Sequence, residues 1–210
     1  MLVLVSGATA TVGRLAPHPN LGILLTPHDG QRAEMVRDRG IPWAADNAAY
    51  SNWDDAAFCR MLDKIRGLPD GLFVTVPDVV GDAKATRQRF KTWAPVARGD
   101  SGQPLAYVGQ DGETVDGVPW DEIACYFVGG TDAWKQSQAS IDLLVYAREH
   151  GKHVHIGRVN SDDRMLWAFE HGCHSIDGTS FSRYPDTYIK RALDKLQGWE
   201  CQRWLFVSRR

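Results

Sequence analysis

Short apolar segments alternate with longer, charged or amphipathic segments along the chain, and this alternation limits the possible folds more than any other feature of the sequence. Residues 72–76 are the clearest of the short segments, because they are β-branched and apolar on both faces. Parallel strands that are covered by helices on both sides have this composition. Pro77 ends the segment, and Asp82 is well placed to begin the basic helix that follows.

About eight strands of this kind are expected, most of them followed by a helix. Strands that alternate with helices form a parallel sheet, and eight such units favour a compact (β/α)8 barrel of the TIM type. A chain of 210 residues lies at the lower end of the size range for this fold, so an open doubly wound sheet is the alternative. The predicted strands cover residues 2–5, 22–26, 41–46, 72–78, 104–109, 123–128, 153–156 and 173–176.

A single catalytic domain is expected over residues 1–210, since no linker, repeat or low-complexity stretch divides the chain. The 43% apolar content is enough for a substantial core. Residues 199–210 are interpreted as a packed C-terminal tail or a last strand. Besides the basic helix that begins at Asp82, helices are predicted over residues 31–39, 54–66, 132–150, 161–171 and 185–196.

The charge and the cysteines narrow the class of protein. A formal net charge of −2 argues against a strong overall attraction to polyanions, although a local basic groove remains compatible with it. No apolar run is long enough to cross a bilayer, and residues 1–5 lack the basic segment of a signal peptide, so a cytoplasmic protein is expected.

Four cysteines without a Cys-x-x-Cys pair are expected to be buried, reduced thiols and not zinc ligands: Cys59, Cys125, Cys173 and Cys201.

Residues 2–13 look like a strand followed by a glycine-rich phosphate loop. A dinucleotide site needs a helix directly after the glycines, because the helix N-terminus holds the pyrophosphate. Pro17 and Pro19 are expected to interrupt any helix within a turn or so of Gly13, so the required helix is taken to be missing. Nucleotide binding is therefore not predicted at this loop, and no cofactor is expected elsewhere.

Carboxylates and glycines directly follow several of the predicted strands. Asp46, Asp78 and Asp177 each stand at the carboxyl end of a strand, and Gly129 and Gly130 follow another. In a (β/α)8 barrel these strand ends meet at one rim, where active sites lie. Converging carboxylates can bind a divalent metal, transfer protons or form a covalent intermediate. The two glycines either let a flat ligand approach the backbone or form a simple turn.

Aromatic and basic side chains lie near the same strand ends. Arg158 follows the strand at 153–156, and Tyr50 lies close to the carboxylate at position 46. An aromatic face at the rim suits stacking on a planar base. His155 and His174 are nearby in sequence, but by alternation from Asp177 both are expected to point into the sheet as structural residues.

Taken together and in order, the strand-end residues resemble the tRNA-guanine transglycosylase superfamily over most of the chain. Residues 43–48 resemble the segment in which an acid/base Asp precedes Ser-Gly-Gly, and Pro77-Asp78 resembles the family's base-recognising Asp. Residues 128–130 resemble its base-pocket Gly-Gly. Residues 172–177 resemble a Gly-x-Asp-x-x-Asp run whose last Asp is the nucleophile.

The resemblance implies a (β/α)8 barrel that breaks the N-glycosidic bond of a nucleotide. Asp177 would then be the nucleophile or the carboxylate that stabilises the positively charged sugar, as in retaining glycosidases. Asp46 would be the general acid/base. Contacts with the base are implied for Asp78, Asn47, Gly129, Gly130 and Arg158.

The chain also departs from the family pattern. The family's Cys-x-Cys-x-x-Cys zinc site is missing, so no metal is expected. Residues 47–49 replace Ser-Gly-Gly with Asn-Ala-Ala, and His174 replaces the first Asp of the nucleophile run. The chain is thus more similar to the short, zinc-less branch of the superfamily. That branch includes phage and bacterial proteins that exchange 7-deazaguanines in DNA or excise modified bases in defence against phage.

We therefore expect a DNA glycosylase that flips out a modified base and leaves an abasic site, with DNA a more fitting partner than tRNA. Three alternatives stay open: a transglycosylase that inserts a 7-deazaguanine in DNA or tRNA, a metal-dependent barrel hydrolase, and a non-catalytic nucleic-acid-binding barrel. The basic run after residue 82 suits either a solvated face or phosphate contacts. The residues expected to contact the nucleic acid are Lys84, Arg87, Arg183 and Tyr50.

Overall fold

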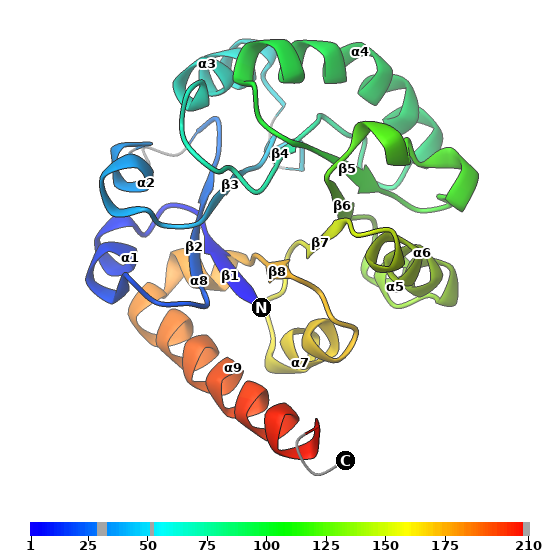
Figure 1. Ribbon diagram of the computed structural model, residues 1–210. Helices are drawn as coiled ribbons and strands as arrows, with labels where there is room; N and C mark the ends of the chain where they lie inside the picture. The colour runs from blue at the N-terminus through cyan, green and yellow to red at the C-terminus, as the bar shows by residue number, and fades with distance from the viewer. Residues whose placement is uncertain (29–32, 51–52, 208–210) are drawn as a thin grey trace.

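The computed structural model describes residues 1–28, 33–50 and 53–207, and its eight parallel strands close into a barrel (Figure 1). Each strand pairs with the next one in sequence, and the last pairs with the first. The predicted (β/α)8 barrel is confirmed, and the open doubly wound sheet is excluded. The strands are β1 (Leu2–Val5), β2 (Leu21–Leu25), β3 (Trp43–Ala45), β4 (Val74–Thr75), β5 (Leu105–Gly109), β6 (Cys125–Val128), β7 (His153–Ile156) and β8 (Ser175–Ile176).

Helices surround the barrel and cover its outer face (Figure 1). Side chains begin several of them, for example Asp54, Asp82 and Ser161, each of which accepts a hydrogen bond from a backbone N–H of the first turn. Two short 3-10 helices, Val115–Gly117 and Trp120–Glu122, connect β5 to β6. The α-helices are α1 (Thr9–Leu15), α2 (Ala33–Arg39), α3 (Asp55–Ile65), α4 (Ala83–Ser101), α5 (Asp132–Lys135), α6 (Gln138–Glu149), α7 (Asp162–Glu170), α8 (Thr179–Arg183) and α9 (Pro185–Val207).

The helices differ from the prediction in three places. The helix expected over residues 132–150 is broken into α5 and α6, because the Ser137 side chain accepts a hydrogen bond from the N–H of Ser140 and starts a new helix. Residues 199–207, expected as a packed tail or last strand, continue α9 as a helix. Within it Trp199 contacts Phe169, with ring centroids 5.4 Å apart. Residues 208–210 and the expected start of α2 at Gln31 lie outside the described residues.

The loop after β1 is the third place. A helix, α1, does begin directly after this glycine-rich loop, and it ends before Pro17. Pro17 and Pro19 were expected to interrupt any helix within a turn or so of Gly13, and α1 does end at Leu15. The expectation that the helix is missing is wrong, because one short helix of seven residues fits before Pro17. No side chain caps its N-terminus at Ala8.

Strand side chains alternate between two separate cores. The outward side chains join the helices in a large core that includes Val3, Trp43 and Tyr107. The inward side chains fill the barrel with a smaller apolar cluster. Its buried members are Leu4, Leu24, Ala44, Phe73, Ala106, Val108, Cys125 and Phe127.

The alternation sets what lies at the carboxyl-end mouth of the barrel. The residue two positions after an inward side chain is directed towards this mouth. Ala44 is thus followed by Asp46, Val108 by Gln110, and Ser175 by Asp177.

Only some of the cysteines behave as predicted. Cys125 and Cys173 are buried free thiols, whereas Cys59 is partly buried and Cys201 is exposed on α9. Cys201 therefore contradicts the expectation of burial, since α9 turns this residue towards solvent. Among the described residues, no helix has both the length and the apolar character needed to cross a membrane.

Candidate active site

A pocket with about 490 Å³ of empty volume opens at the carboxyl ends of the strands, and we call it the mouth pocket. The three predicted carboxylates, Asp46, Asp78 and Asp177, all line it. The other predicted residues that line it are Asn47, Tyr50, Gly129, Gly130 and Arg158.

Asp78 is held in place by two amide side chains. Asn47 Nδ2 donates to Asp78 Oδ1 at 2.9 Å, and Gln110 Nε2 donates to Asp78 Oδ2 at 2.5 Å. Asn47 Nδ2 also donates to the carbonyl of Val76 at 2.9 Å, so this side chain ties the loop after β3 to the end of β4. The Asp78 residue is 7% exposed, and its burial raises the pKa of the carboxyl.

The pKa of the Asp46 carboxyl is strongly perturbed. Burial and the nearby negative charges of Asp177 and Asp78 raise its pKa to about 7. Backbone N–H groups of residues 47 and 48 act in the opposite direction and stabilise the charged form. A carboxyl with a pKa near neutrality can both donate and accept a proton at physiological pH.

Asp177 is fixed by hydrogen bonds to both of its oxygens. His155 Nε2 lies 2.9 Å from Asp177 Oδ2, and the backbone N–H of Arg158 donates to Asp177 Oδ1 at 3.2 Å. The Asp177 side chain is 20% exposed, while that of His155 is fully buried. The carboxylate therefore faces the mouth pocket from a fixed position.

A chain of polar contacts continues from Asp177 into the barrel. His155 Nδ1 lies 2.8 Å from Ser175 Oγ, which in turn lies 2.7 Å from His153 Nε2. Phe73 packs against both imidazoles, with ring centroids 5.6 Å from His153 and 5.2 Å from His155. Burial next to the other imidazole lowers the pKa of His153 to about 3, so this ring is neutral at physiological pH.

The two histidines expected to be structural thus differ. His155 lies inside the barrel, as predicted, but it contacts Asp177 directly and so belongs to the site. His174 is exposed, and its Nδ1 accepts a hydrogen bond from the N–H of Val154 at 2.9 Å. The expectation that His174 points into the sheet with His155 is wrong. His174 directly precedes Ser175, which contacts His155 inside the barrel, and neighbouring residues on an extended segment point to opposite faces.

Arg158 bridges two sides of the mouth pocket. Its backbone has a φ of +62°, and its guanidinium donates from Nη2 to the carbonyl of Gly130 at 2.6 Å. The same guanidinium lies 4.3 Å from the centroid of the Tyr50 ring. Since Tyr50 is 65% exposed, the stacked pair presents an aromatic and cationic edge at the entrance to the pocket.

Lys135 and Gln110 also line the mouth pocket, and neither was predicted. Lys135 is 6% exposed, and its Nζ donates to the carbonyl of Gly157 at 2.6 Å. Burial and the positive charge of Arg158 lower its pKa to about 8. Gln110 stands directly after β5 and two residues beyond the inward Val108, so the alternation carried a signal for it. No comparable signal marked Lys135, which lies at the end of the short helix α5 and not directly after a strand.

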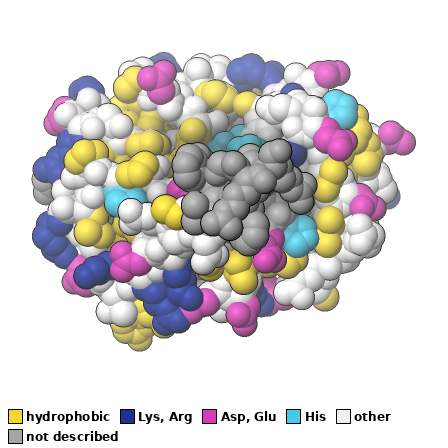
Figure 2. All heavy atoms as spheres, turned by 60° about the horizontal axis from the view of Figure 1, so that its bottom comes forward, with side chains coloured by type: hydrophobic (Ala, Val, Ile, Leu, Met, Phe, Trp, Pro, Cys, Tyr) yellow, Lys and Arg dark blue, Asp and Glu magenta, His cyan; other side chains and the backbone are white. Residues whose placement is uncertain are grey.

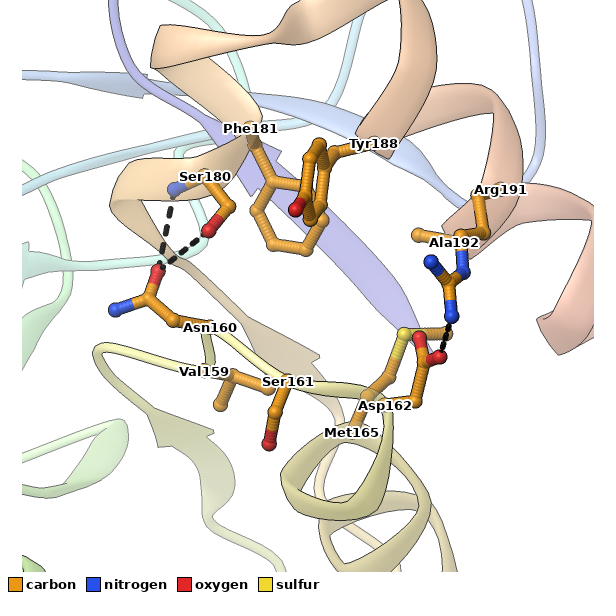
Figure 3. A pocket seen from close by; sticks show the side chains of 10 residues that line it. All are labelled: Val159, Asn160, Ser161, Asp162, Met165, Ser180, Phe181, Tyr188, Arg191 and Ala192. Carbon is orange, nitrogen blue, oxygen red and sulfur yellow. Dashed lines mark hydrogen bonds and ion pairs between the residues drawn. The ribbon is translucent and has the colours of Figure 1, made fainter.

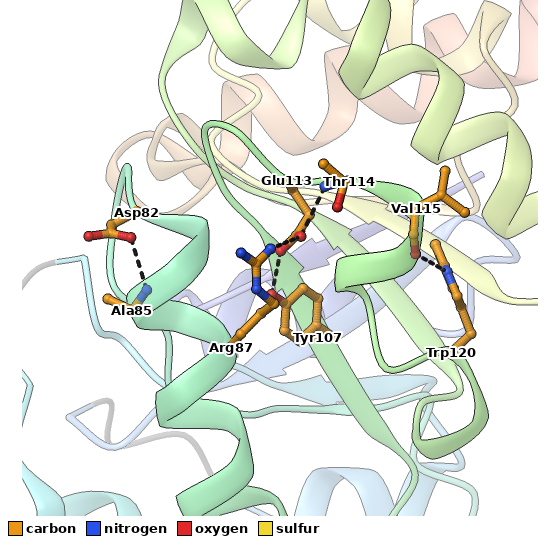
Figure 4. A network of polar contacts seen from close by, with 8 residues as sticks. All are labelled: Asp82, Ala85, Arg87, Tyr107, Glu113, Thr114, Val115 and Trp120. Atoms are coloured by element: carbon orange, nitrogen blue, oxygen red, sulfur yellow. Dashed lines mark hydrogen bonds and ion pairs between the residues drawn. The ribbon is translucent and has the colours of Figure 1, made fainter.

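The predicted nucleic-acid contacts lie outside the pocket, apart from Tyr50. Lys84 and Arg183 are exposed on α4 and α8. Arg87 instead pairs with the fully buried side chain of Glu113, with 2.6 Å between Nη1 and Oε1 (Figure 4). Tyr107 donates its hydroxyl proton to the same carboxylate. On the face shown in Figure 2, Lys and Arg side chains are interspersed with Asp and Glu.

A second pocket, with about 630 Å³ of empty volume, lies between α7, α8 and α9, and we call it the side pocket (Figure 3). Asn160 Oδ1 accepts a hydrogen bond from the N–H of Ser180 at 3.1 Å on one side of it. Asp162 pairs with Arg191 on the other side. None of the three predicted aspartates lines the side pocket, so it is separate from the carboxylate cluster.

Within the described residues, no group of three or more His, Cys, Asp and Glu side chains is arranged to hold a metal ion. Neither the protein-family models nor the curated proteins that were searched contain a match to the chain.

The ion pair of Arg87 leads to a test of its role. Replacing Arg87 by Met leaves Glu113 buried without its cation, and breaking a buried pair in this way costs about 3 kcal/mol of unfolding free energy. The matched variant Lys84→Met on the exposed side of the same helix should change stability by no more than about 0.5 kcal/mol. Urea unfolding measures both. Equal stabilities would contradict the structural role and favour a free cation for phosphate binding.

The proton on Asp46 makes the stability depend on pH. Its pKa is about 7 in the folded chain, against 3.8 for the unperturbed group, so the folded state holds this proton more tightly. Above about pH 5 the unfolded state has already lost this proton, whereas the folded state loses it only as the pH rises towards about 8. The free energy of unfolding therefore falls by on the order of 2 kcal/mol over this range. Asp46→Asn carries an uncharged side chain, like the protonated group, so its free energy of unfolding should lack this fall with pH. Urea unfolding at several pH values measures the free energy for both proteins. Identical pH profiles for the two proteins would contradict the raised pKa.

Proposed function

We propose that the protein breaks the N-glycosidic bond of a modified nucleobase in DNA, as a glycosylase that flips the nucleotide out and leaves an abasic site. The observation that carries the proposal is that two carboxylates of different character line one pocket at the barrel mouth. Asp177 is fixed by two hydrogen bonds, whereas Asp46 exchanges a proton near neutral pH. Glycosidic bond cleavage requires these two roles.

Asp177 acts on the sugar in this proposal. As the base departs, positive charge builds on C1′, and a carboxylate beneath that carbon stabilises the charge or captures the sugar covalently. The hydrogen bonds from His155 and from the Arg158 N–H hold the carboxylate in place before the reaction begins. Little reorganisation is then needed when the charge develops.

Asp46 moves the proton. In its protonated form it donates to the departing base, so that the base leaves as a neutral species. The resulting Asp46 carboxylate then accepts a proton from the water that attacks C1′. The raised pKa of Asp46 supports this role, because both forms are populated at physiological pH.

Asp78 and the Gly129-Gly130 backbone contact the base in this proposal. The amides of Asn47 and Gln110 hold Asp78 in the pocket wall, where it can accept hydrogen bonds from a base edge. At Gly129 a side chain does not fit, because a Cβ would lie 2.5 Å from Val108 Cγ1 and 2.9 Å from Gln110 Nε2. A glycine is therefore needed for the backbone to pack against these two side chains, and this backbone lines the pocket, where a planar base could contact it.

The Tyr50–Arg158 pair suits the entrance for an extruded nucleotide. An exposed aromatic ring can stack on a base, and the guanidinium adds positive charge close to the phosphates. Exposed Lys84 and Arg183 would contact the DNA backbone further away. The proposal places the protein in the cytoplasm, acting on DNA with modified bases such as that of infecting phage.

Base exchange is the alternative reaction of the same site. Excision and exchange share the steps up to the loss of the first base and differ in whether water or a second base, such as a 7-deazaguanine, attacks C1′. The absence of the family's zinc segment from the sequence favours excision from DNA over exchange in tRNA. A non-catalytic binding barrel is less well supported, because it gives no reason for three carboxylates to share one pocket.

The test is incubation with duplexes that carry different modified bases, followed by detection of free base and of alkali-labile strands. Asp177→Asn should lower base release by about 1,000-fold, because it removes the negative charge beneath C1′ while keeping the size of the side chain. Asp194→Asn, an exposed change on α9, is the matched control and should retain full activity. Full activity of Asp177→Asn would overturn the assignment. New base in the strand without alkali-labile sites would show exchange in place of excision.

A further inference from the structure

Lys135 is a buried amine that the proposed glycosylase reaction does not use. It ends the short helix α5 and is 6% exposed. Among the described residues no carboxylate lies within ion-pair distance of its Nζ, which donates to the carbonyl of Gly157 at 2.6 Å. Burial of a cation without a carboxylate favours the neutral, nucleophilic amine. The positive charge of Arg158 acts in the same direction.

The amine lies beside the carboxylate that is proposed to face C1′. Lys135 and Asp177 line the same mouth pocket. Gly157 connects them, because its carbonyl accepts the bond from Lys135 Nζ, and a Cβ on Gly157 would lie 3.1 Å from Asp177 Oδ2. A Cβ at residue 157 would also lie 2.7 Å from the Phe127 ring, so only a glycine lets this backbone pack against both Phe127 and Asp177. A sugar held over Asp177 would therefore have the Lys135 amine close to it.

We propose that Lys135 forms an imine with the C1′ aldehyde of the abasic sugar, and that the protein thereby cleaves the DNA strand as a lyase. This inference rests on the proposed function, since base removal at the same pocket supplies the abasic sugar. It adds a second reaction, strand cleavage, which base excision by itself does not require.

The chemistry needs no oxidant or reductant. The neutral amine attacks the aldehyde carbon of the ring-opened sugar, and the carbonyl oxygen takes up protons and leaves as water, which gives a protonated imine. Asp46, which has lost its proton to solvent and is a carboxylate again, removes a proton from C2′. The electron pair of that C–H bond forms a carbon–carbon double bond as the C3′–O bond breaks, and the 3′-phosphate leaves with the electrons. Water then hydrolyses the imine and restores Lys135.

The experiment uses the full-length protein and a duplex with one preformed abasic site, treated with borohydride. Borohydride reduces an imine to a stable amine, so a covalent protein–DNA adduct is expected, with the modified peptide carrying the link on Lys135. Without borohydride the abasic strand should be cleaved on the 3′ side of the site. Lys135→Arg keeps a cation for the Gly157 carbonyl but cannot form the imine, and it should lower both yields by at least about 100-fold. Lys190→Arg, an exposed change on α9, should leave them unchanged.

The absence of an adduct, or a wild-type adduct that maps to any other amine, overturns the inference. Because mapping is done on the wild-type protein, the result does not depend on whether Lys135→Arg folds. The preformed abasic site also separates the two proposals. Release of base from modified DNA without an adduct overturns the lyase alone, whereas an adduct at Lys135 without base release from any modified DNA overturns the glycosylase alone.

Discussion

Closing eight parallel strands into a barrel directs every second side chain into a narrow interior and brings all the carboxyl ends to one mouth. Here the interior is apolar on most strands, with residues such as Leu4 and Phe73, but it is polar along β7 and β8. The polar part, from His153 through Ser175 and His155, ends at Asp177. This division sets the position of the candidate site, since the mouth pocket opens where the chain of polar contacts from His153 to Asp177 reaches the end of the barrel.

Three carboxylates in one partly buried pocket repel one another, and each is stabilised in a different way. Asp78 accepts hydrogen bonds from two amides, and Asp177 accepts them from an imidazole and a backbone N–H. Asp46 accepts hydrogen bonds from two backbone N–H groups, but burial and the charges of the other two carboxylates still raise its pKa to about 7. The three groups thus differ in their surroundings although they share a pocket, and this difference suits them to separate chemical roles.

The residues that directly follow the strands could be predicted from the sequence. The side chains from other elements that contact them could not. A carboxylate or glycine directly after an apolar run, as at Asp46 or Gly129, has its position fixed by the two-residue period and by barrel closure. Lys135 lacked such a signal, because it lies at the end of α5, in a stretch that was predicted as one unbroken helix. His155 lay on a predicted strand, but its bond to Asp177 depends on the register of β7 against β8, which pairs His155 with Ser175. Arg87 was predicted to contact phosphate from its place in a basic run, and nothing in that run indicates its buried partner, Glu113, which lies 26 residues away.

The most direct measurement of the central claim is a crystal structure of the protein bound to a duplex that carries one tetrahydrofuran abasic analogue. The account predicts that the sugar is flipped out of the duplex into the mouth pocket. Its C1′ atom should lie about 3–3.5 Å from the Asp177 carboxylate, the distance of a near-attack arrangement. The analogue bound elsewhere, with Asp46, Asp78 and Asp177 free of contact with the nucleotide, would contradict it.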